Sequence, residues 1–128
     1  MPEHLSDGEV VNGKKEGHWI TYYANGKKKS EGGFKNGQKD GKWILYYNNG
    51  NKKSEATFRN NNYEGHYVSY HENGQKFREG HYAEHQGNSY DGRKESVWYQ
   101  YDKDGNVDTK VTYEHGRVVE RISQPPFD

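Results

Sequence analysis

The chain has 128 residues, of which 28% are hydrophobic, and a mean hydropathy of −1.49; it has no thick aliphatic core and no run of ~20 apolar residues that would span a membrane. Its 19 Lys and Arg residues balance 19 Asp and Glu residues, which argues against a dedicated nucleic-acid binder, and the absence of cysteine excludes disulfides and thiolate metal sites. Aromatic residues make up 15% of the chain, too many for a disordered protein, so rings must provide most of the buried surface.

Residues 1–9 form a lead-in without an apolar run, which predicts a cytoplasmic protein rather than a secreted one. A repeat then organises residues 10–122, with partial units at both ends and a tail at 123–128. Five columns of aligned residues share spacings of 24, 24 and 31. The full units lie near 16–39, 40–63, 64–94 (with an insertion at 84–94) and 95–119. The columns are Trp19, Trp43, Tyr67 and Trp98; Tyr22, Tyr46, Tyr70 and Tyr101; Gly26, Gly50, Gly74 and Gly105; Phe34, Phe58, Tyr82 and Tyr113; and Glu16, Asp40, Glu64 and Glu95.

Each unit reads as a β-hairpin. In the first unit a short aromatic run at 19–23 precedes Asn25-Gly26, a strong sequence cue for a hairpin turn. The second strand covers 27–34, and a further turn at 36–37 leads into the next unit. About four such hairpins predict an all-β fold, an elongated single-layer antiparallel meander of about ten strands.

The period of two along a strand assigns the faces of the sheet. Small residues share one face of the second strands with the aromatic column that begins at Phe34, so we expect a neighbouring ring to lie across each of them. The opposite face of the same strands carries charges and is expected to be solvated. The small residues are Gly32, Ala56 and Gly80, followed by Val111; the charged ones are Lys29, Glu31, Lys53, Glu55 and Glu79.

The run from Gly32 through Asn36-Gly37, followed by Asp40-Gly41-Lys42-Trp43 and Asn49-Gly50, resembles the MORN repeat (membrane occupation and recognition nexus) over roughly residues 10–119. Trp43 stands where the commoner repeat has a second glycine, a feature of the bacterial variant. The resemblance implies an elongated hairpin array that binds other molecules. Many bacterial proteins of this type are similar to YwqK-like antitoxins or immunity partners of secreted toxins, whereas some eukaryotic members are linked to membrane lipids or scaffolding.

Three constellations could carry chemistry, and each has a plainer explanation. Four histidines at 66, 71, 81 and 85 could hold a metal, but the column of His18 and His66 also accepts Lys42, so we expect surface histidines and no metal or other cofactor. The periodic acidic column is better explained by turn chemistry than by acid–base catalysis. Lysine clusters alternate with glutamates, as on a solvated face.

Departures from the repeat predict the partner-binding site. The insertion contains a tyrosine and an arginine, two residue types that are frequent at binding hot spots, and nearby side chains break their columns. Phe77 stands in the column of Lys29 and Lys53, on the face expected to be solvated, so we expect its side chain to be exposed. A neutral insertion in a decaying repeat is the alternative explanation. The candidate partner-binding residues are Phe77, Arg78, His71, His85, Tyr90 and Arg93.

These features predict a protein-binding module without catalytic activity, and the resemblance implies an immunity protein or antitoxin that occludes a partner toxin. The expected partner is therefore a protein, the cognate toxin. The first alternative is a MORN-type scaffold or a peripheral membrane protein whose partner is a membrane lipid.

 The second alternative, ranked last, is an enzyme with a histidine-based site.

Charges at the outer strands, Glu9 at one end and Arg117, Glu120 and Arg121 at the other, discourage edge-to-edge pairing and favour a monomer. No nucleic-acid partner is expected.

Overall fold

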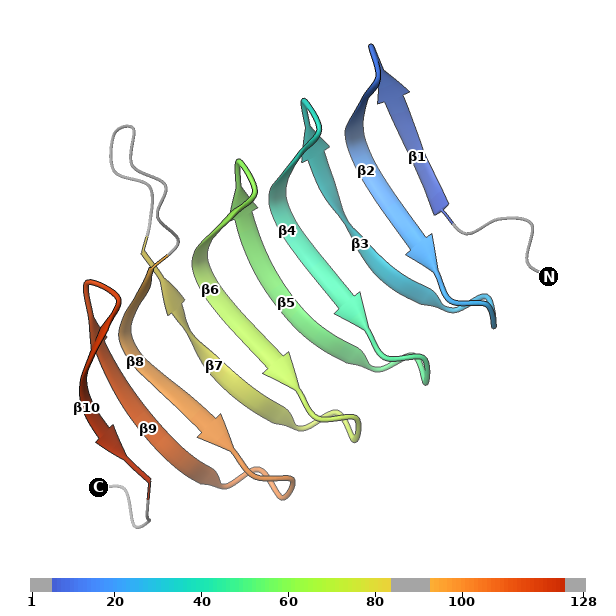
Figure 1. The fold of residues 1–128 in the computed structure, drawn as a ribbon. Helices are drawn as coiled ribbons and strands as arrows, with labels where there is room; N and C mark the ends of the chain where they lie inside the picture. The colour runs from blue at the N-terminus through green and yellow to red at the C-terminus, as the bar shows by residue number, and fades with distance from the viewer. Residues whose placement is uncertain (1–5, 84–92, 124–128) are drawn as a thin grey trace.

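The computed structural model describes residues 6–83 and 93–123, which form one antiparallel sheet of ten strands (Figure 1). The strands follow one another in sequence order, so the predicted single-layer meander is confirmed. No helix long and apolar enough to cross a membrane occurs in the described residues. The strands are β1 (Ser6–Val11), β2 (Lys14–Tyr22), β3 (Lys28–Lys35), β4 (Gln38–Tyr46), β5 (Lys52–Arg59), β6 (Asn62–Tyr70), β7 (Lys76–Tyr82), β8 (Lys94–Tyr101), β9 (Val107–Glu114) and β10 (Arg117–Ile122).

Two element boundaries differ from the sequence prediction. β1 begins at Ser6, so the predicted lead-in at 1–9 already contains most of a strand that pairs with β2. β8 begins at Lys94, which pairs with Tyr82, so Lys94 belongs to the sheet and not to the insertion predicted at 84–94. Both errors arose because partial or interrupted units offer few repeat columns for alignment.

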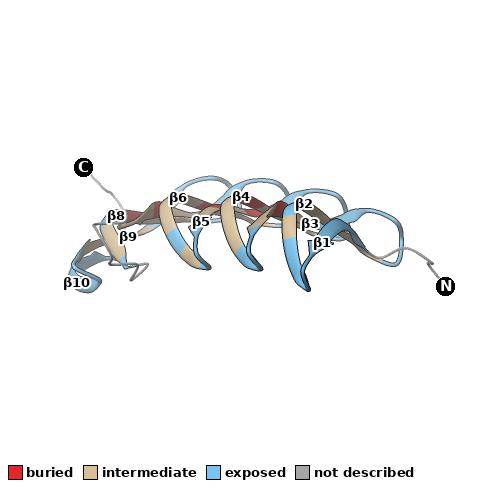
Figure 2. Ribbon diagram, turned by 90° about the horizontal axis from the view of Figure 1, so that it is seen from above, coloured by how far each residue is buried: buried red, intermediate tan, exposed pale blue. Residues whose placement is uncertain are grey.

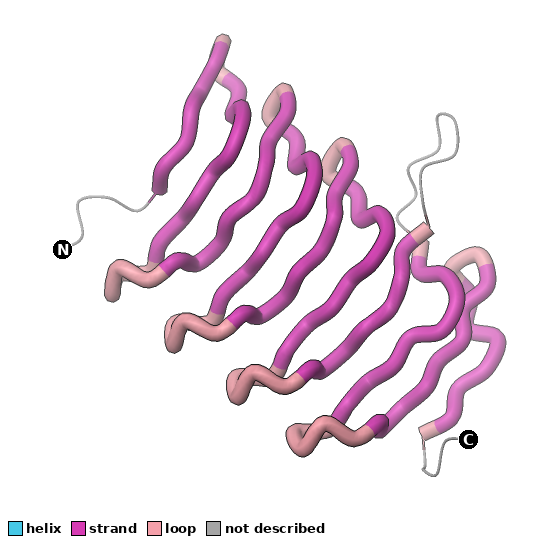
Figure 3. Tube along the Cα trace, turned by 180° about the vertical axis from the view of Figure 1, so that it is seen from behind, coloured by secondary structure: helices cyan, strands magenta, loops and turns pink. Residues whose placement is uncertain are grey.

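Tight two-residue turns join the strands at one end of the sheet (Figure 3). Both central residues of these turns have positive φ, as in Asn36 (53°) and Gly37 (81°), which is the type I′ geometry that suits a twisted hairpin. The turn at Asn60 and Asn61 keeps this geometry without glycine, because asparagine tolerates the left-handed region.

Wider turns join the strands at the other end, and here asparagine has a different role from the one its sequence suggests. Only the glycine of Asn25-Gly26 has positive φ. The Asn25 side chain instead accepts a hydrogen bond from the Lys27 amide at 2.9 Å and donates one to the Asn48 carbonyl at 3.0 Å. The Asn column therefore links each turn to the equivalent turn of the next hairpin.

A β-bulge in each repeat aims the large ring. The register between β3 and β4 shifts between Gly32 and Phe34, and Gly41 at this bulge has a φ of 88°. The Trp43 indole N–H then donates to the Gly33 carbonyl at 2.9 Å. Three of the four full repeats have glycine at this left-handed position, whereas the fourth has Ser96 with a φ of 59°.

We expect Ser96→Gly to raise the free energy of unfolding by ~1 kcal/mol, because serine in the left-handed region is strained and glycine is not. Chemical denaturation monitored by tryptophan fluorescence measures this difference. Gly41→Ser, which introduces the same strain in an interior repeat, should change stability in the opposite direction. Equal stabilities for wild type and both variants would contradict the argument.

The core is a row of rings laid across glycines. A Cβ atom added to Gly32 would lie 2.1 Å from Cδ2 of Trp43, and the same overlap with a tryptophan occurs at Gly8 and Gly80. The predicted crossing of rings over small residues is thus confirmed, and Gly8 extends the column into β1. Figure 2 shows the most buried residues as a band along the middle of the sheet; the buried hydrophobic residues are Trp43, Ala56, Val68, Trp98 and Val111.

Candidate functional site

The sheet has two chemically different faces. We call the face that carries Trp19, Trp43, Tyr67 and Trp98 the Trp face, and the face that carries Tyr22, Tyr46, Tyr70 and Tyr101 the Tyr face. On the Trp face the second strand of each repeat adds a further ring, which meets the larger rings edge to face: Phe34 lies 5.0 Å from Trp43, and Tyr82 lies 5.0 Å from Trp98, between ring centroids. The aromatic side chains therefore form one row along the sheet.

Cations cover this aromatic row at three places. The Nζ atoms of Lys15, Lys39 and Lys94 each lie 4.8–5.2 Å from the centroids of two rings. The third repeat has Tyr63 in this column instead. Tyr63 stacks on Tyr82 with 4.5 Å between centroids, and 38% of its surface is exposed, so the middle of the row presents an open ring.

The glutamates of the Tyr face are paired with cations and half-buried, whereas the lysines beside them are exposed, so the prediction that this face is solvated is correct for the lysines and wrong for the glutamates. The Glu31 and Glu55 side chains are only 16% and 17% exposed. The hydroxyl of Tyr46, from the following repeat, donates to Glu31 at 2.7 Å, and Lys52 donates to Glu55 at 2.8 Å. This ladder of tyrosine, carboxylate and lysine ties adjacent hairpins together.

The ladder shifts the proton affinity of its members. The hydrogen bond from Lys52, assisted by Lys42, lowers the pKa of Glu55 to about 2 against the opposing effect of burial. Burial and the hydrogen bond to Glu31 raise the pKa of Tyr46 to about 12. The Glu55 carboxylate therefore stays ionised and the Tyr46 phenol stays protonated at neutral pH, so neither of them exchanges a proton near pH 7.

The ladder predicts a pH dependence of folding. Because the pKa of Glu55 is lowered from 4.5 to about 2 in the folded state, its contribution to stability is present above ~pH 4.5 and is lost as the pH falls through about 2. We expect Glu55→Gln to be less stable than wild type at neutral pH. The difference in the free energy of unfolding should vanish as the pH falls to about 2, the pKa of Glu55 in the folded protein. Unfolding in urea at a series of pH values measures it. Glu72→Gln, in an exposed turn, is the control; a Glu55→Gln deficit that does not vary with pH would contradict the prediction.

The predicted site residues His71 and Phe77 compensate for one another. In the first two repeats the equivalent pairs are Tyr23 with Lys29, and Tyr47 with Lys53, which are cation–π contacts. In the third repeat the His71 ring lies 4.9 Å from the Phe77 ring, so Phe77 is half-buried and not the exposed side chain that the sequence suggested. The His71 Nε2 atom also lies 2.9 Å from the Tyr101 carbonyl, the contact that tyrosine makes in earlier repeats.

The remaining predicted residues do not form one cluster. Arg78 follows Phe77 on β7 and faces the Trp face, whereas Arg93 lies at the opposite end of β7, where its carbonyl accepts a hydrogen bond from Ala83 at 2.6 Å. The Arg93 side chain contacts the turn at Gly116. His85 and Tyr90 lie outside the described residues.

Arg121 is a site residue that the sequence analysis missed. Repeat spacing aligns Ile122 with the tryptophan column, but Arg121 pairs with Val111, at the place where a ring would stand in the other repeats. The cause is Glu120, which stands where the bulge of the full repeats has its left-handed residue. The register between β9 and β10 therefore shifts by one residue less than the register between β3 and β4 does at the equivalent bulge. The missing glycine was the signal in the sequence.

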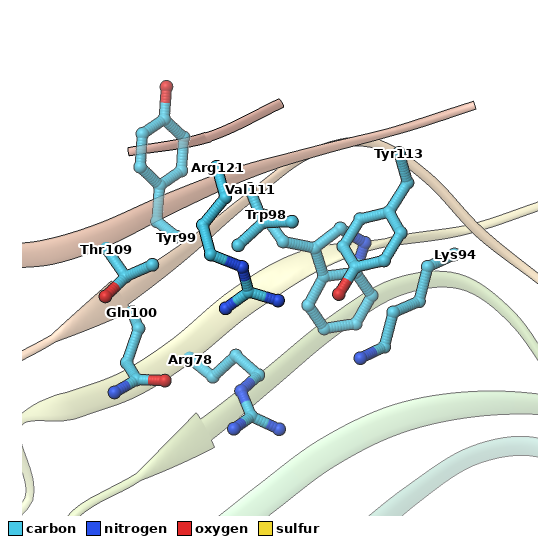
Figure 4. A pocket seen from close by; sticks show the side chains of 9 residues that line it. All are labelled: Arg78, Lys94, Trp98, Tyr99, Gln100, Thr109, Val111, Tyr113 and Arg121. Carbon is cyan, nitrogen blue, oxygen red and sulfur yellow. The ribbon is translucent and has the colours of Figure 1, made fainter. Parts of the chain in front are cut away.

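Arg121 and Arg78 line a hollow of about 360 Å³ on the Trp face, which we call the arginine hollow (Figure 4). Lys94, Trp98 and Tyr113 complete its wall and floor, and the ring of Tyr99 points away from it. The hollow begins where the aromatic row ends, because no fifth large ring follows Trp98.

The other constellations in the sequence have structural roles. Within residues 6–83 and 93–123, no group of three or more His, Cys, Asp or Glu side chains is placed to hold a metal ion. His66 instead lies 3.0 Å from Glu79, and Lys42 lies 3.1 Å from Glu55. The acidic column does serve turns, as predicted: Glu16 accepts a hydrogen bond from the Asn36 amide at 2.7 Å.

Comparison with known protein families agrees with this geometry. The profile of the MORN repeat variant matches residues 15–36, 39–60, 63–84 and 94–115, which is more than half of the chain. The chain belongs to the MORN repeat variant family. Each matched segment of this MORN protein begins at the column of Lys15 and runs through one hairpin, and the first, second and fourth segments end in the next tight turn. The repeats form a binding scaffold, and no curated protein matches the chain.

Proposed function

We propose that this MORN protein is a non-catalytic, monomeric protein-binding module, and that it acts as a bacterial, cytoplasmic immunity protein or antitoxin that neutralises a partner toxin by occluding it. The observation that carries the binding role is the aromatic row of the Trp face, held by a rigid sheet and open at Tyr63. Rigid tyrosine and tryptophan side chains are the usual anchors of protein interfaces. The immunity role follows from the resemblance to bacterial proteins with this repeat.

The shape of the sheet supports occlusion rather than capture of a small ligand. Ten strands at ~4.8 Å spacing give a surface roughly 45 Å long, which has room for one side of a standard interface of ~1,600 Å². The ladder of the Tyr face engages its carboxylates and phenols in structural hydrogen bonds. The Trp face is therefore the better candidate for a surface that covers the active site of a toxin.

The test is co-expression and pull-down with the product of the adjacent upstream gene, at low and high salt. We expect a one-to-one complex and rescue of growth from the toxicity of that product. Tyr63→Lys restores the residue type of Lys15 and Lys39, so it should fold and weaken the complex at least about tenfold. Asn62→Lys adds the same side chain one residue away on the opposite face and should leave binding unchanged.

Two results would overturn the proposal. Absence of a complex together with salt-sensitive binding to anionic vesicles would assign the protein to MORN-type lipid-binding scaffolds. Hydrolytic activity that is lost on replacing His71 or His81 would assign it to enzymes. A complex that Tyr63→Lys leaves intact would keep the immunity role and move the interface away from the Trp face.

A further inference from the structure

We propose that the arginine hollow binds a carboxylate side chain of an acidic segment that the partner protein presents to the Trp face. This inference rests on the proposed function, because it names the chemistry by which the same face recognises its partner. It begins from a contrast in charge between the two faces of one sheet.

The cations of the hollow lack the acidic partners that cations of the Tyr face have. Glu31, Glu55 and Glu79 each lie within 4.0 Å of a lysine or histidine side chain on the Tyr face. No such ion pair joins Arg78, Lys94 or Arg121 to an acidic residue in the described parts of the chain, and no carboxylate lines the hollow. The chain as a whole has no net charge, yet this site collects three positive charges.

The positions of these cations depart from the repeat, so the fold does not require them. Arg78 stands where the first two repeats have Ser30 and Ser54, and Arg121 stands where a ring would otherwise lie. Lys94 keeps its repeat position, with its Nζ atom 4.9 Å from the Trp98 centroid and 5.2 Å from that of Tyr113. The hollow therefore combines the two guanidinium groups of Arg78 and Arg121 with the lysine Lys94. Every repeat except the third has a lysine at the position of Lys94.

The geometry favours a carboxylate carried by a polypeptide. Guanidinium groups bind carboxylates through two parallel hydrogen bonds, and Arg121 reaches from β10 across β9 toward Arg78 (Figure 4). A hollow of about 360 Å³ is near the lower limit of ligand pockets, which suits one or two side chains. It opens onto the aromatic row, where apolar side chains flanking the acidic residue would pack against the half-buried ring of Tyr113.

The probe is a synthetic acetyl-Glu-Phe-Glu-amide peptide, with acetyl-Gln-Phe-Gln-amide as its uncharged match. Binding is followed by NMR through the three tryptophan indole N–H signals. Trp98 reports on the hollow, while Trp19 and Trp43 lie along the row outside it. We expect the acidic peptide to shift the Trp98 signal first, the uncharged peptide not to shift it, and added salt to weaken the effect.

Variants locate the charge that is responsible. Arg78→Ser restores the residue of the earlier repeats, so it should fold, and both it and Arg121→Ser are expected to weaken binding of the acidic peptide about tenfold. Lys103→Ser removes one positive charge from an exposed turn outside the hollow and should change affinity little. The same variants should weaken the complex with the partner protein.

Four outcomes would overturn the inference: no shift at Trp98, equal shifts with both peptides, stronger binding of inorganic phosphate, or stronger binding of anionic vesicles. The two proposals fail separately. A partner complex that Arg78→Ser and Arg121→Ser leave unchanged would overturn the inference and preserve the proposed function. A protein that binds the acidic peptide as expected but does not bind the adjacent gene product would lose the proposed immunity role while the hollow remained an acidic-peptide site.

Discussion

Gly80→Ala is expected to lower the free energy of unfolding by ~1–3 kcal/mol, because its new Cβ atom would lie 2.0 Å from Cδ2 of Trp98. The ring has little space to move, since Trp98 is 3% exposed and its indole N–H donates to the His81 carbonyl at 3.1 Å. Urea denaturation of wild type and variant measures the loss. Ala24→Val, which enlarges a side chain in an exposed turn, is the matched control and should be near neutral.

The pairing of β5 with β6, between the second and third repeats, shows how this variant can be rescued. There Ala56 pairs with Tyr67, so a Cβ atom occurs together with the smaller ring, while glycine opposes tryptophan in the repeats on either side. Gly80→Ala combined with Trp98→Tyr should therefore be more stable than the sum of the single effects predicts, by ~0.5–3 kcal/mol. Additive losses would show that the ring and the small residue are not coupled, which would contradict the packing argument.

Repeat spacing predicted the parts of the fold that depend on local chemistry and on alternation. Asn-Gly pairs and aromatic runs indicate hairpins, and the small residues beginning at Gly32 indicate where a ring must cross. These features are properties of one strand and its immediate neighbour. They could be predicted because every unit repeats them, so a single misassigned position does not alter the result.

The candidate site depended on features that repeat columns do not contain. The place of Arg121 on the Trp face follows from a bulge that lacks a left-handed residue at Glu120, and one residue of register moves a side chain to the other face. Phe77 was predicted to be exposed because its column is charged, but His71 had changed as well and covers it. Paired substitutions across strands become visible only when the pairing is known.

Trp43→Ala is expected to be among the most damaging single changes, lowering the free energy of unfolding by ~3–5 kcal/mol. Trp43 is 5% exposed, lies over Gly32 and packs against Phe34, so its loss opens a cavity between two interior hairpins. Trp19→Ala should cost less, because Trp19 is half-buried and lies over the outermost strand β1. Thermal unfolding followed by circular dichroism compares the two variants.

Hydrogen exchange would show how far the damage from Trp43→Ala extends. In a sheet where each strand pairs only with its sequence neighbours, stability is close to a sum of local and nearest-neighbour contributions. Amides of β3, β4 and β5 should therefore lose protection first, while those of β8 and β9 keep it. Uniform loss across all ten strands would mean that the array unfolds as one cooperative unit. The stability of the arginine hollow, which is lined by residues of β7 to β10, would then depend on the Trp43 contact as strongly as on the contacts among its own lining residues.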